Sequence, residues 1–306
     1  MKNKILVGSL LVAFFSFMLY STSLKRIENA NLHVVEPRQS KTIKGKKAVS
    51  KPSEPHVDEV EYANHVKVAR GSEKSWAKQI EQTLGQEKSY QVCVQDLNSH
   101  KFVRIANSTK QHGVTATSRL FLLVSVYYQE QHGKLSARTA IKVHKKDRVK
   151  GEKLLRVGYS YGIAYLKQAM MHGNKTAANV LLRKVGPSRV NRLLSKMGAT
   201  NTKIGNKFTA NPVSMTTAAD LVQVMTNLGQ NKTLNRQYVG MVLTALNLTH
   251  AKSPLVRAIN GQSYSVFDSK SVVALVQSRG HTYCVGFWGS SNQNMAKLGR
   301  TINQFF

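Results

Sequence analysis

The segment that most constrains the fold of this chain is residues 113–133, GVTATSRLFLLVSVYYQEQHG. A polar turn leads into an apolar stretch whose large residues recur at helical spacing, which predicts a helix with one buried stripe. The stripe consists of Leu120, Leu123, Val124 and Tyr127. The first turn of this helix, residues 116–119, should lie where a loop meets the core. Because a helix N-terminus stabilises negative charge, reactive groups are often placed at such a point.

The charge of the chain is strongly one-sided. Its 306 residues include 45 Lys and Arg against 15 Asp and Glu, a formal net charge of +30. Residues 79–306 alone hold 31 basic and 8 acidic side chains, so the excess belongs to the body of the chain. Such a charge predicts attraction to a polyanion, whether nucleic acid, anionic lipid or an anionic wall polymer.

Residues 1–24 predict a membrane segment. Lys2 and Lys4 precede an uncharged, mostly apolar stretch, Ile5 to Leu24, whose length as a helix is about 30 Å, enough to span a bilayer. No small-residue cleavage site follows, which favours an uncleaved signal anchor over a cleaved signal peptide. We therefore expect a single-pass membrane protein with an extracytoplasmic domain, or a secreted one if the segment is cleaved.

Export makes nucleic acid a poor partner. The expected partner is an anionic cell-wall polymer or the membrane surface, with peptidoglycan as a further candidate. Residues 25–71 are rich in Lys, Ser, Pro and Glu and poor in large apolar residues, which predicts a disordered linker.

Residues 72–306 show the patterns of one folded domain. Strand-like runs occur near both of its ends, and the middle, residues 138–250, is mostly helical in pattern. The expected strands are 90–97, 102–105, 264–267, 271–277 and 282–288, and the expected terminal helices are 72–85 and 291–304. This order predicts an α+β fold with an antiparallel five-stranded sheet, flanked by the N- and C-terminal helices, and an inserted all-α lobe.

The two cysteines, Cys93 and Cys284, each lie inside a strand-like run. An exported protein can hold a disulfide, so the two either form one bridge or remain small buried residues, and we favour the second. Two distant cysteines do not predict a metal site, and the histidines lack H-E-x-x-H spacing. We expect no metal and no cofactor.

Five short motifs carry a resemblance to class A β-lactamases and penicillin-binding transpeptidases. They are D-L-N-S at 96–99, G-K-L-S at 133–136, T-A-A-N-V-L-L at 176–182, G-A-T-N-T at 198–202 and T-T-A-A-D-L at 216–221. The resemblance covers about residues 72–306 and implies the fold of these serine hydrolases. Their chemistry requires S-x-x-K, S-D-N and K-T-G, in which the serine attacks a carbonyl and the lysine helps to take its proton.

The first motif is not intact. The ungapped register places Ala116 at the nucleophile and Arg119 at the base, and arginine does not deprotonate near neutral pH. A register shifted by two residues places Ser118 at the nucleophile but Phe121 at the base. We favour the first register.

The other two motifs also fail. The resemblance requires S-D-N at the positions that Gly173, Asn174 and Lys175 hold. The neighbouring His172 suggests that a Ser118–His172 dyad could replace the missing base. An exposed loop histidine is the simpler interpretation. The K-T-G candidate, Lys270-Ser271-Val272, lacks the glycine, and we interpret Lys270 as a charged residue at a strand start. The loop 202–211 has no E-x-x-L-N, so the deacylating glutamate has no counterpart.

Loss of a nucleophile or its base typically lowers the catalytic rate on the order of 10⁴–10⁶-fold. Because none of the three motifs is intact here, we expect a pseudoenzyme. The leading hypothesis is a membrane-tethered module that binds a polyanion. A surviving serine hydrolase and a scaffold for wall-synthesis or division proteins are the alternatives. The binding cluster would be Lys142, Lys145, Lys146, Arg148, Lys150, Lys153 and Arg156, and a second patch would be Arg183, Lys184, Arg189 and Arg192.

Overall fold

The computed structural model describes residues 66–306 apart from 86, 206 and 249–250. The predicted signal anchor at 1–24 and most of the predicted linker lie outside these described residues. Within them, no helix is both long enough and apolar enough to cross a bilayer. Residues 64–306 form one compact unit with its own hydrophobic clusters, which is the property expected of a domain that folds by itself.

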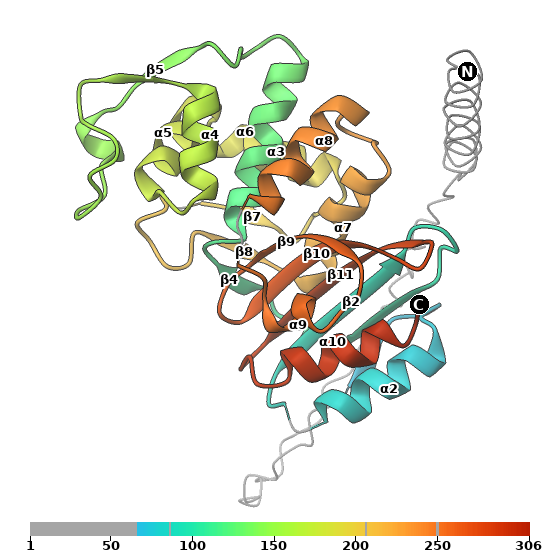
Figure 1. Ribbon diagram of the computed structural model, residues 1–306. Coiled ribbons are helices and arrows are strands. Elements are labelled where there is room, and N and C mark those ends of the chain that lie inside the picture. The colour runs from blue at the N-terminus through green and yellow to red at the C-terminus, as the bar shows by residue number, and fades with distance from the viewer. Residues whose placement is uncertain (1–65, 86, 206, 249–250) are drawn as a thin grey trace, which may run out of the picture. The chain divides into compact units, whose positions relative to one another are not determined.

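A six-stranded antiparallel sheet joins the two ends of this domain, as the sequence predicts (Figure 1). Its strand order is β1-β3-β2-β11-β10-β9. The strands are β1 (Lys67–Val68), β2 (Tyr90–Asp96), β3 (Phe102–Ala106), β9 (Gln262–Phe267), β10 (Ser271–Ser278) and β11 (His281–Gly289). The five expected strands are all present. The extra strand, β1, pairs with β3 from inside the predicted linker, so the domain starts before residue 72.

Both faces of the sheet are covered, which explains why β10 is buried along almost its whole length. Alternate residues of a strand point to opposite faces. Val272 and Val276 therefore pack in the cluster with the terminal helices, whereas Val273 and Leu275 pack in the cluster of the helical lobe. The helices on the first face are α2 (Lys74–Leu84), α9 (Pro254–Arg257) and α10 (Met295–Asn303). Trp76 of α2 stacks on Phe305, just after α10, with ring centroids 4.8 Å apart.

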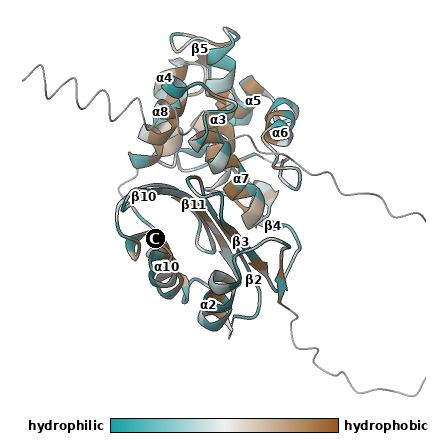
Figure 2. Cartoon of the chain, turned by 90° about the vertical axis from the view of Figure 1, so that its right-hand side faces the viewer, coloured by the Kyte–Doolittle hydropathy of each residue, from teal (hydrophilic) through white to brown (hydrophobic). Residues whose placement is uncertain are grey.

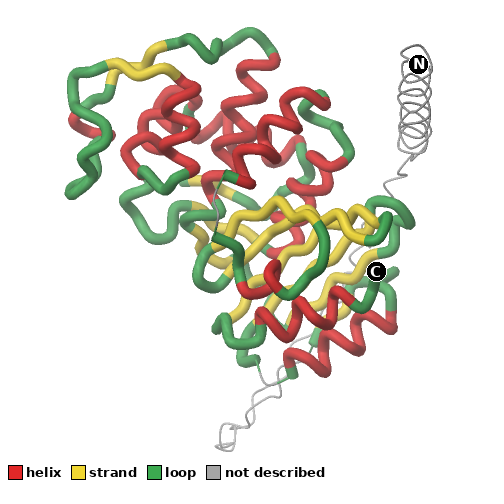
Figure 3. Tube along the Cα trace, in the orientation of Figure 1, coloured by secondary structure: helices red, strands yellow, loops and turns green. Residues whose placement is uncertain are grey.

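The second face carries the helical lobe, whose central element is α3 (Figures 1 and 3). Its helices are α3 (Ser118–Gln131), α4 (Ile163–Met171), α5 (Lys175–Val185), α6 (Pro187–Lys196), α7 (Ala218–Gly229) and α8 (Arg236–Asn247). The expectation of a single buried stripe on α3 is wrong. Five consecutive residues, 120–124, are completely buried, because other helices and the sheet surround this helix. Figure 2 shows hydrophobic residues along α3 and along the strands below it.

The lobe also contains short strands that the helical pattern of residues 138–250 does not predict. One small sheet has the order β4-β8-β7, and another pairs β5 with β6. Their bounds are β4 (His112–Val114), β5 (Ala140–Lys142), β6 (Ser160–Gly162), β7 (Lys203–Ile204) and β8 (Ser214–Thr216). A 3₁₀ turn, η1 (Lys145–Asp147), follows β5.

The lobe packs closely on the sheet at Gly286 of β11. A Cβ atom at this glycine would lie 2.7 Å from the Ala218 carbonyl oxygen and 2.7 Å from Val222 Cγ2, both on α7. Only a residue without a side chain allows this contact between helix and sheet.

Gly286→Ala is expected to lower the free energy of unfolding by about 1–3 kcal/mol, because the added methyl group forces α7 away from the sheet. Gly240→Ala is the matched control, since Gly240 lies in α8, is exposed and has nothing within 4 Å of an added Cβ. That control should raise the free energy of unfolding by about 0.5–1 kcal/mol through helix propensity. Urea denaturation measures both. Equal effects of the two variants would contradict the close packing.

Candidate functional site

A groove of about 350 Å³ lies at the first turn of α3. Arg119 lines it from the first turn of α3, and Ala116 lines it from two residues before that helix. The other walls include His172 and Gly173, which follow α4, and Val266 and Phe267 at the end of β9. Met171, Leu248 and Ala251 complete its described wall. The structure therefore brings together Ala116, Arg119 and Gly173, as the ungapped register requires.

Ser118 is not part of this groove. Its side chain is completely buried, and its Oγ donates to the Val114 carbonyl oxygen at 3.2 Å. His172 is exposed at the groove, so the two residues do not form a dyad. The alternative nucleophile predicted from the sequence is wrong, because the side chain at this helical position points into the protein interior.

Asp268, in the turn between β9 and β10, binds the N-terminal end of α3. Its carboxylate accepts hydrogen bonds from the backbone N–H groups of Thr115, Ala116 and Thr117 at 3.3, 2.6 and 3.0 Å. The Thr117 hydroxyl donates to the same carboxylate at 2.7 Å. Thr115 and Ala116 precede α3 and Thr117 is its N-cap residue, so these N–H groups belong to the turn that leads into the positive end of the helix. The residue at the N-cap, Thr117, provides no cap hydrogen bond itself, so Asp268 supplies the cap from another part of the chain.

One of these N–H groups belongs to Ala116, which the ungapped register places at the nucleophile position. Stabilisation of an oxyanion needs N–H donors directed at the position where the charge develops. Here the N–H of Ala116, the residue at the nucleophile position, already donates to Asp268. Among the described residues, none that lines the groove carries a hydroxyl, and the N–H of Ala116 is occupied.

Arg119 extends along the wall of the groove. Burial lowers the pKa of its guanidinium, whereas the charges of Asp268 and Glu152 raise it, and the group stays a cation at neutral pH. Its Nε is buried and has no hydrogen-bond partner among the described residues. A Cβ at Gly173 would lie 3.9 Å from Arg119 Nη2, so Gly173 leaves the guanidinium room; its φ of 96° also favours glycine.

Asn174 and Lys175 have a structural role at the start of α5. The Asn174 Oδ1 caps this helix by accepting from Ala177 N at 2.7 Å. The Glu152 carboxylate accepts from the backbone N–H groups of Lys175 and Thr176 at 2.7 and 2.8 Å. Neither Asn174 nor Lys175 lines the groove.

Lys270 directly precedes β10 and is exposed. It lines a different, shallower cavity of about 610 Å³, together with His112 and Trp288. Lys270 does not line the groove at the start of α3, where β9 contributes the apolar side chains of Val266 and Phe267.

The two cysteines are free and buried, which is the alternative that the sequence analysis favours over a disulfide. Cys93 and Cys284 lie on the paired strands β2 and β11, where their Cα partners are Gly286 and Gln95. Burial raises the pKa of the Cys284 thiol to about 12, which keeps it protonated. Among the described residues, no cluster of His, Cys, Asp or Glu could hold a metal ion.

The predicted basic cluster lies on the long segment 143–159, which connects β5 with β6 and is here called the basic loop (Figure 1). Of the cluster, Lys142, at the end of β5, and the loop residues Lys145, Lys146, Lys150, Lys153 and Arg156 are exposed. Arg148 is only partly exposed, and its Nη1 donates to the Leu155 carbonyl oxygen at 2.6 Å, so it supports the loop.

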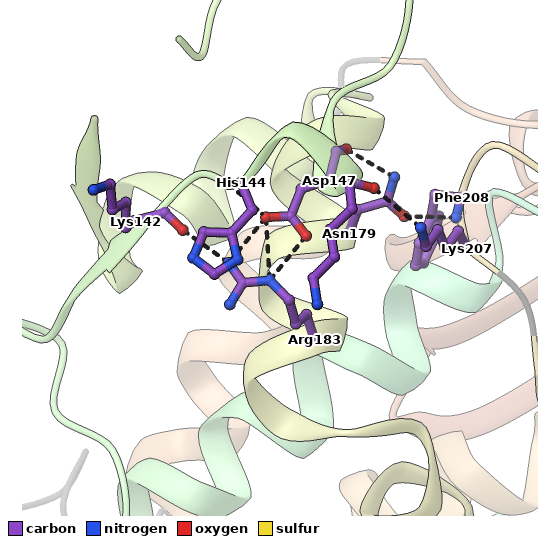
Figure 4. Close-up of polar contacts among 8 residues, drawn as sticks. Lys142, His144, Asp147, Asn179, Arg183, Lys207 and Phe208 are labelled. Atoms are coloured by element: carbon purple, nitrogen blue, oxygen red, sulfur yellow. Dashed lines mark hydrogen bonds and ion pairs between the residues drawn. The ribbon is translucent and has the colours of Figure 1, made fainter. Parts of the chain in front are cut away.

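An ion pair between Asp147 and Arg183 holds the base of this loop (Figure 4). Arg183 Nε lies 2.9 Å from Asp147 Oδ1, and its Nη2 donates to the Lys142 carbonyl oxygen at 2.8 Å. Burial raises the pKa of the Asp147 carboxyl, but Arg183 and the His144 N–H outweigh burial and hold the pKa below its ordinary value. Arg183 therefore has a structural role and is not available to a polyanion. Lys184, Arg189 and Arg192 remain exposed.

The basic loop also exposes large apolar side chains, which the sequence analysis missed. Leu154, Val157 and Tyr159 have exposed fractions of 51%, 45% and 59%, and the neighbouring Tyr165 of α4 has 41%. Between them Leu155 is completely buried and fixes the loop to the core. The available signal was the mixture of apolar and basic residues in Lys153-Leu-Leu-Arg156-Val157, which resembles neither a buried strand nor a polar turn.

Asp268→Ala is expected to lower the free energy of unfolding by about 1–3 kcal/mol, because the N–H groups at the start of α3 lose their acceptor. Lys270→Ala is the matched control, since it changes an exposed side chain two residues away and should stay within about 0.5 kcal/mol of the parent. Urea denaturation measures both. If the two variants were equally stable, Asp268 would not be the cap of α3.

Comparison with known proteins places this geometry in a family. The model of the β-lactamase enzyme family matches residues 75–306. No curated protein matches the chain. Among solved structures, a mutant of PBP-A in an acyl-enzyme complex with penicillin G is similar, with a TM-score of 0.68, 15% identity, and coverage of 76% of this chain and 96% of that one.

Two β-lactamases give similar values. The TLA-3 extended-spectrum β-lactamase has a TM-score of 0.67 at 15% identity, covering 76% of this chain and 98% of its own. A β-lactamase from Chitinophaga pinensis has a TM-score of 0.66 at 12% identity, and the match covers 76% of this chain and 99% of that protein. At these identities the structures show a shared fold. Because the family model covers most of its length, the chain belongs to the β-lactamase enzyme family.

Proposed function

We propose that this chain is a non-catalytic member of its family that docks on an anionic membrane surface through the basic loop. The observation that carries the proposal is the groove at the start of α3, which Ala116 and Arg119 line and where the Ala116 N–H is occupied, combined with an exposed surface that is both basic and apolar. The first feature argues against acyl transfer, and the second argues for a lipid partner.

Three separate features of the groove oppose acyl transfer. Ala116 has no nucleophilic atom, Arg119 cannot accept a proton near neutral pH, and the Ala116 N–H already donates to Asp268. Restoring one of them would leave the other two in place. A groove with these properties is suited to binding and not to the formation of an acyl-enzyme.

The apolar residues of the basic loop favour a membrane over a wall polymer. A water-soluble polyanion needs cations only, and gains nothing from exposed Leu154, Val157 and Tyr159. Basic and apolar side chains both contribute to binding at a bilayer interface. Lysines and arginines interact with the anionic headgroups, and aliphatic and aromatic side chains enter the boundary between headgroups and acyl chains. Four of the eight large hydrophobic residues exposed in the described part of the chain lie within 154–165. This concentration is what a docking surface requires.

The basic loop is ordered before it meets a partner. Leu155 is buried in the core, the Asp147–Arg183 pair holds one end, and the Glu152 carboxylate binds the start of α5. Binding by a preformed loop loses less conformational entropy than binding by a flexible one. The loop also extends from the helical lobe away from the sheet (Figure 1), so it can contact a flat surface. The predicted membrane anchor at residues 1–24 would keep the domain near a bilayer.

Vesicle binding of residues 64–306 tests this function, with the segment's folding first checked by a cooperative urea transition. We expect binding to vesicles of phosphatidylcholine with about one-third phosphatidylglycerol, weak binding to pure phosphatidylcholine, and loss of binding near about 0.5 M salt, where charges are strongly screened. The charge variant Lys150→Gln/Lys153→Gln/Arg156→Gln should weaken binding roughly 100-fold, at about 1 kcal/mol for each cation.

The apolar variant Leu154→Ser/Val157→Ser/Tyr159→Ser distinguishes the partners. We expect it to weaken vesicle binding on the order of 10–100-fold. The control Met215→Ser/Met241→Ser removes two exposed apolar side chains outside the loop and should have no effect. If the apolar variant bound vesicles like the parent, while poly(glycerol phosphate) competed fully, the partner would be a wall polymer. If the charge variant bound like the parent, the basic loop would not be the docking surface.

A further inference from the structure

The groove at the first turn of α3 has features of a ligand site that docking on a membrane does not use. It shares no lining residue with the basic loop. We infer that this groove binds a small molecule that carries one carboxylate on an apolar body, with Arg119 as the residue that contacts the carboxylate. This site goes beyond the proposed function and would exist whether or not the loop binds lipid.

Arg119 is a cation without a fixed partner. It forms no ion pair within the described residues, and its Nε is buried without an acceptor. A buried charge is costly unless it is paired, so an unpaired guanidinium at a groove wall calls for an anion. Its terminal nitrogens face the space that Gly173 leaves open, where a side chain would approach Nη2. The flat guanidinium fork fits the two oxygens of a carboxylate.

The charges of Asp268 and Glu152 raise the pKa of Arg119, but neither carboxylate forms an ion pair with it among the described residues. Asp268 accepts hydrogen bonds from the start of α3, and Glu152 accepts them from the start of α5. Each carboxylate thus faces the positive end of a helix, which is equivalent to roughly half a positive charge. With both acids used as helix caps, the guanidinium remains the cation that a ligand in the groove would meet.

The other walls of the groove are mostly apolar. Met171, Leu248, Val266 and Phe267 contribute to them. A volume of about 350 Å³ lies at the lower end of the range for small-molecule sites. A hydrophilic anion such as a phosphorylated sugar would leave its hydroxyl groups unpaired against these walls. The chemistry of the walls therefore selects a carboxylate with an alkyl or aromatic body.

Isothermal titration of residues 64–306 with three probes tests the site. Octanoate has the charge and the apolar body, acetate has only the charge, and octanol has only the body. We expect octanoate to bind at one site per chain. Its affinity should be at least about 100-fold higher than that of acetate, because each buried methylene raises the binding constant about fourfold. Octanoate should also bind on the order of tenfold or more tightly than octanol, through its contact with the guanidinium.

Variants assign the site to named residues. Arg119→Met should weaken octanoate binding on the order of 10–100-fold and leave octanol binding unchanged or improved. Arg192→Met is the matched control, because it removes an exposed arginine from α6 and should change neither affinity. Phe267→Ala should weaken the binding of octanoate more than the binding of acetate. The urea midpoint of each variant shows that it is folded.

Two results would overturn the inference. Equal affinities for octanoate and octanol would show that no cation takes part, and unchanged octanoate binding in a folded Arg119→Met would place the ligand elsewhere. Neither result depends on vesicle binding, so failure of this site and failure of the membrane proposal are distinguishable.

Discussion

The hydrogen bonds between Asp268 and the first turn of α3 are the interaction on which the rest of the structure depends. They connect the turn between two sheet strands to the helix at the centre of the lobe, across more than 150 residues of sequence. They supply the cap that no neighbouring residue supplies, and so define where α3 begins. They also occupy the N–H groups that a hydrolase of this family would need for an oxyanion. The same contact therefore links the start of α3 to the loss of acyl transfer that we propose.

The start of α5, near the groove, follows the same logic. Asn174 and Glu152 satisfy the N-terminal N–H groups of α5, where the family's second motif would lie. Because Glu152 belongs to the basic loop, this contact also fixes the loop against the lobe. The cation at Arg119 is left between two capped helices. The groove thus combines the positive charge of Arg119 with mostly apolar walls.

The sequence was sufficient for the features that depend on local periodicity. The hairpin strands, α3 and its C-terminal glycine follow from spacing alone, and the length of α3 selected the register with Ala116 and Arg119. Features that depend on distant contacts could not be predicted. Nothing near Asp268 in the sequence indicates that it caps α3, and Arg183 looks like a free surface cation until Asp147 is seen beside it. The all-round burial of α3 and the exposure of Leu154, Val157 and Tyr159 likewise depend on which elements pack against them.

The central claim is that the groove has lost acyl transfer through its architecture, beyond the loss of one serine. The most direct measurement is the intact mass of the protein after incubation with benzylpenicillin, for the parent and for Ala116→Ser/Arg119→Lys. We predict no covalent adduct on either, because Asp268 still occupies the N–H at residue 116 and Gly173 still lacks a hydroxyl. A stoichiometric adduct on the parent would show that catalytic chemistry survives. An adduct on the double variant alone would show that the two side chains were the whole loss and that the Asp268 cap is no barrier.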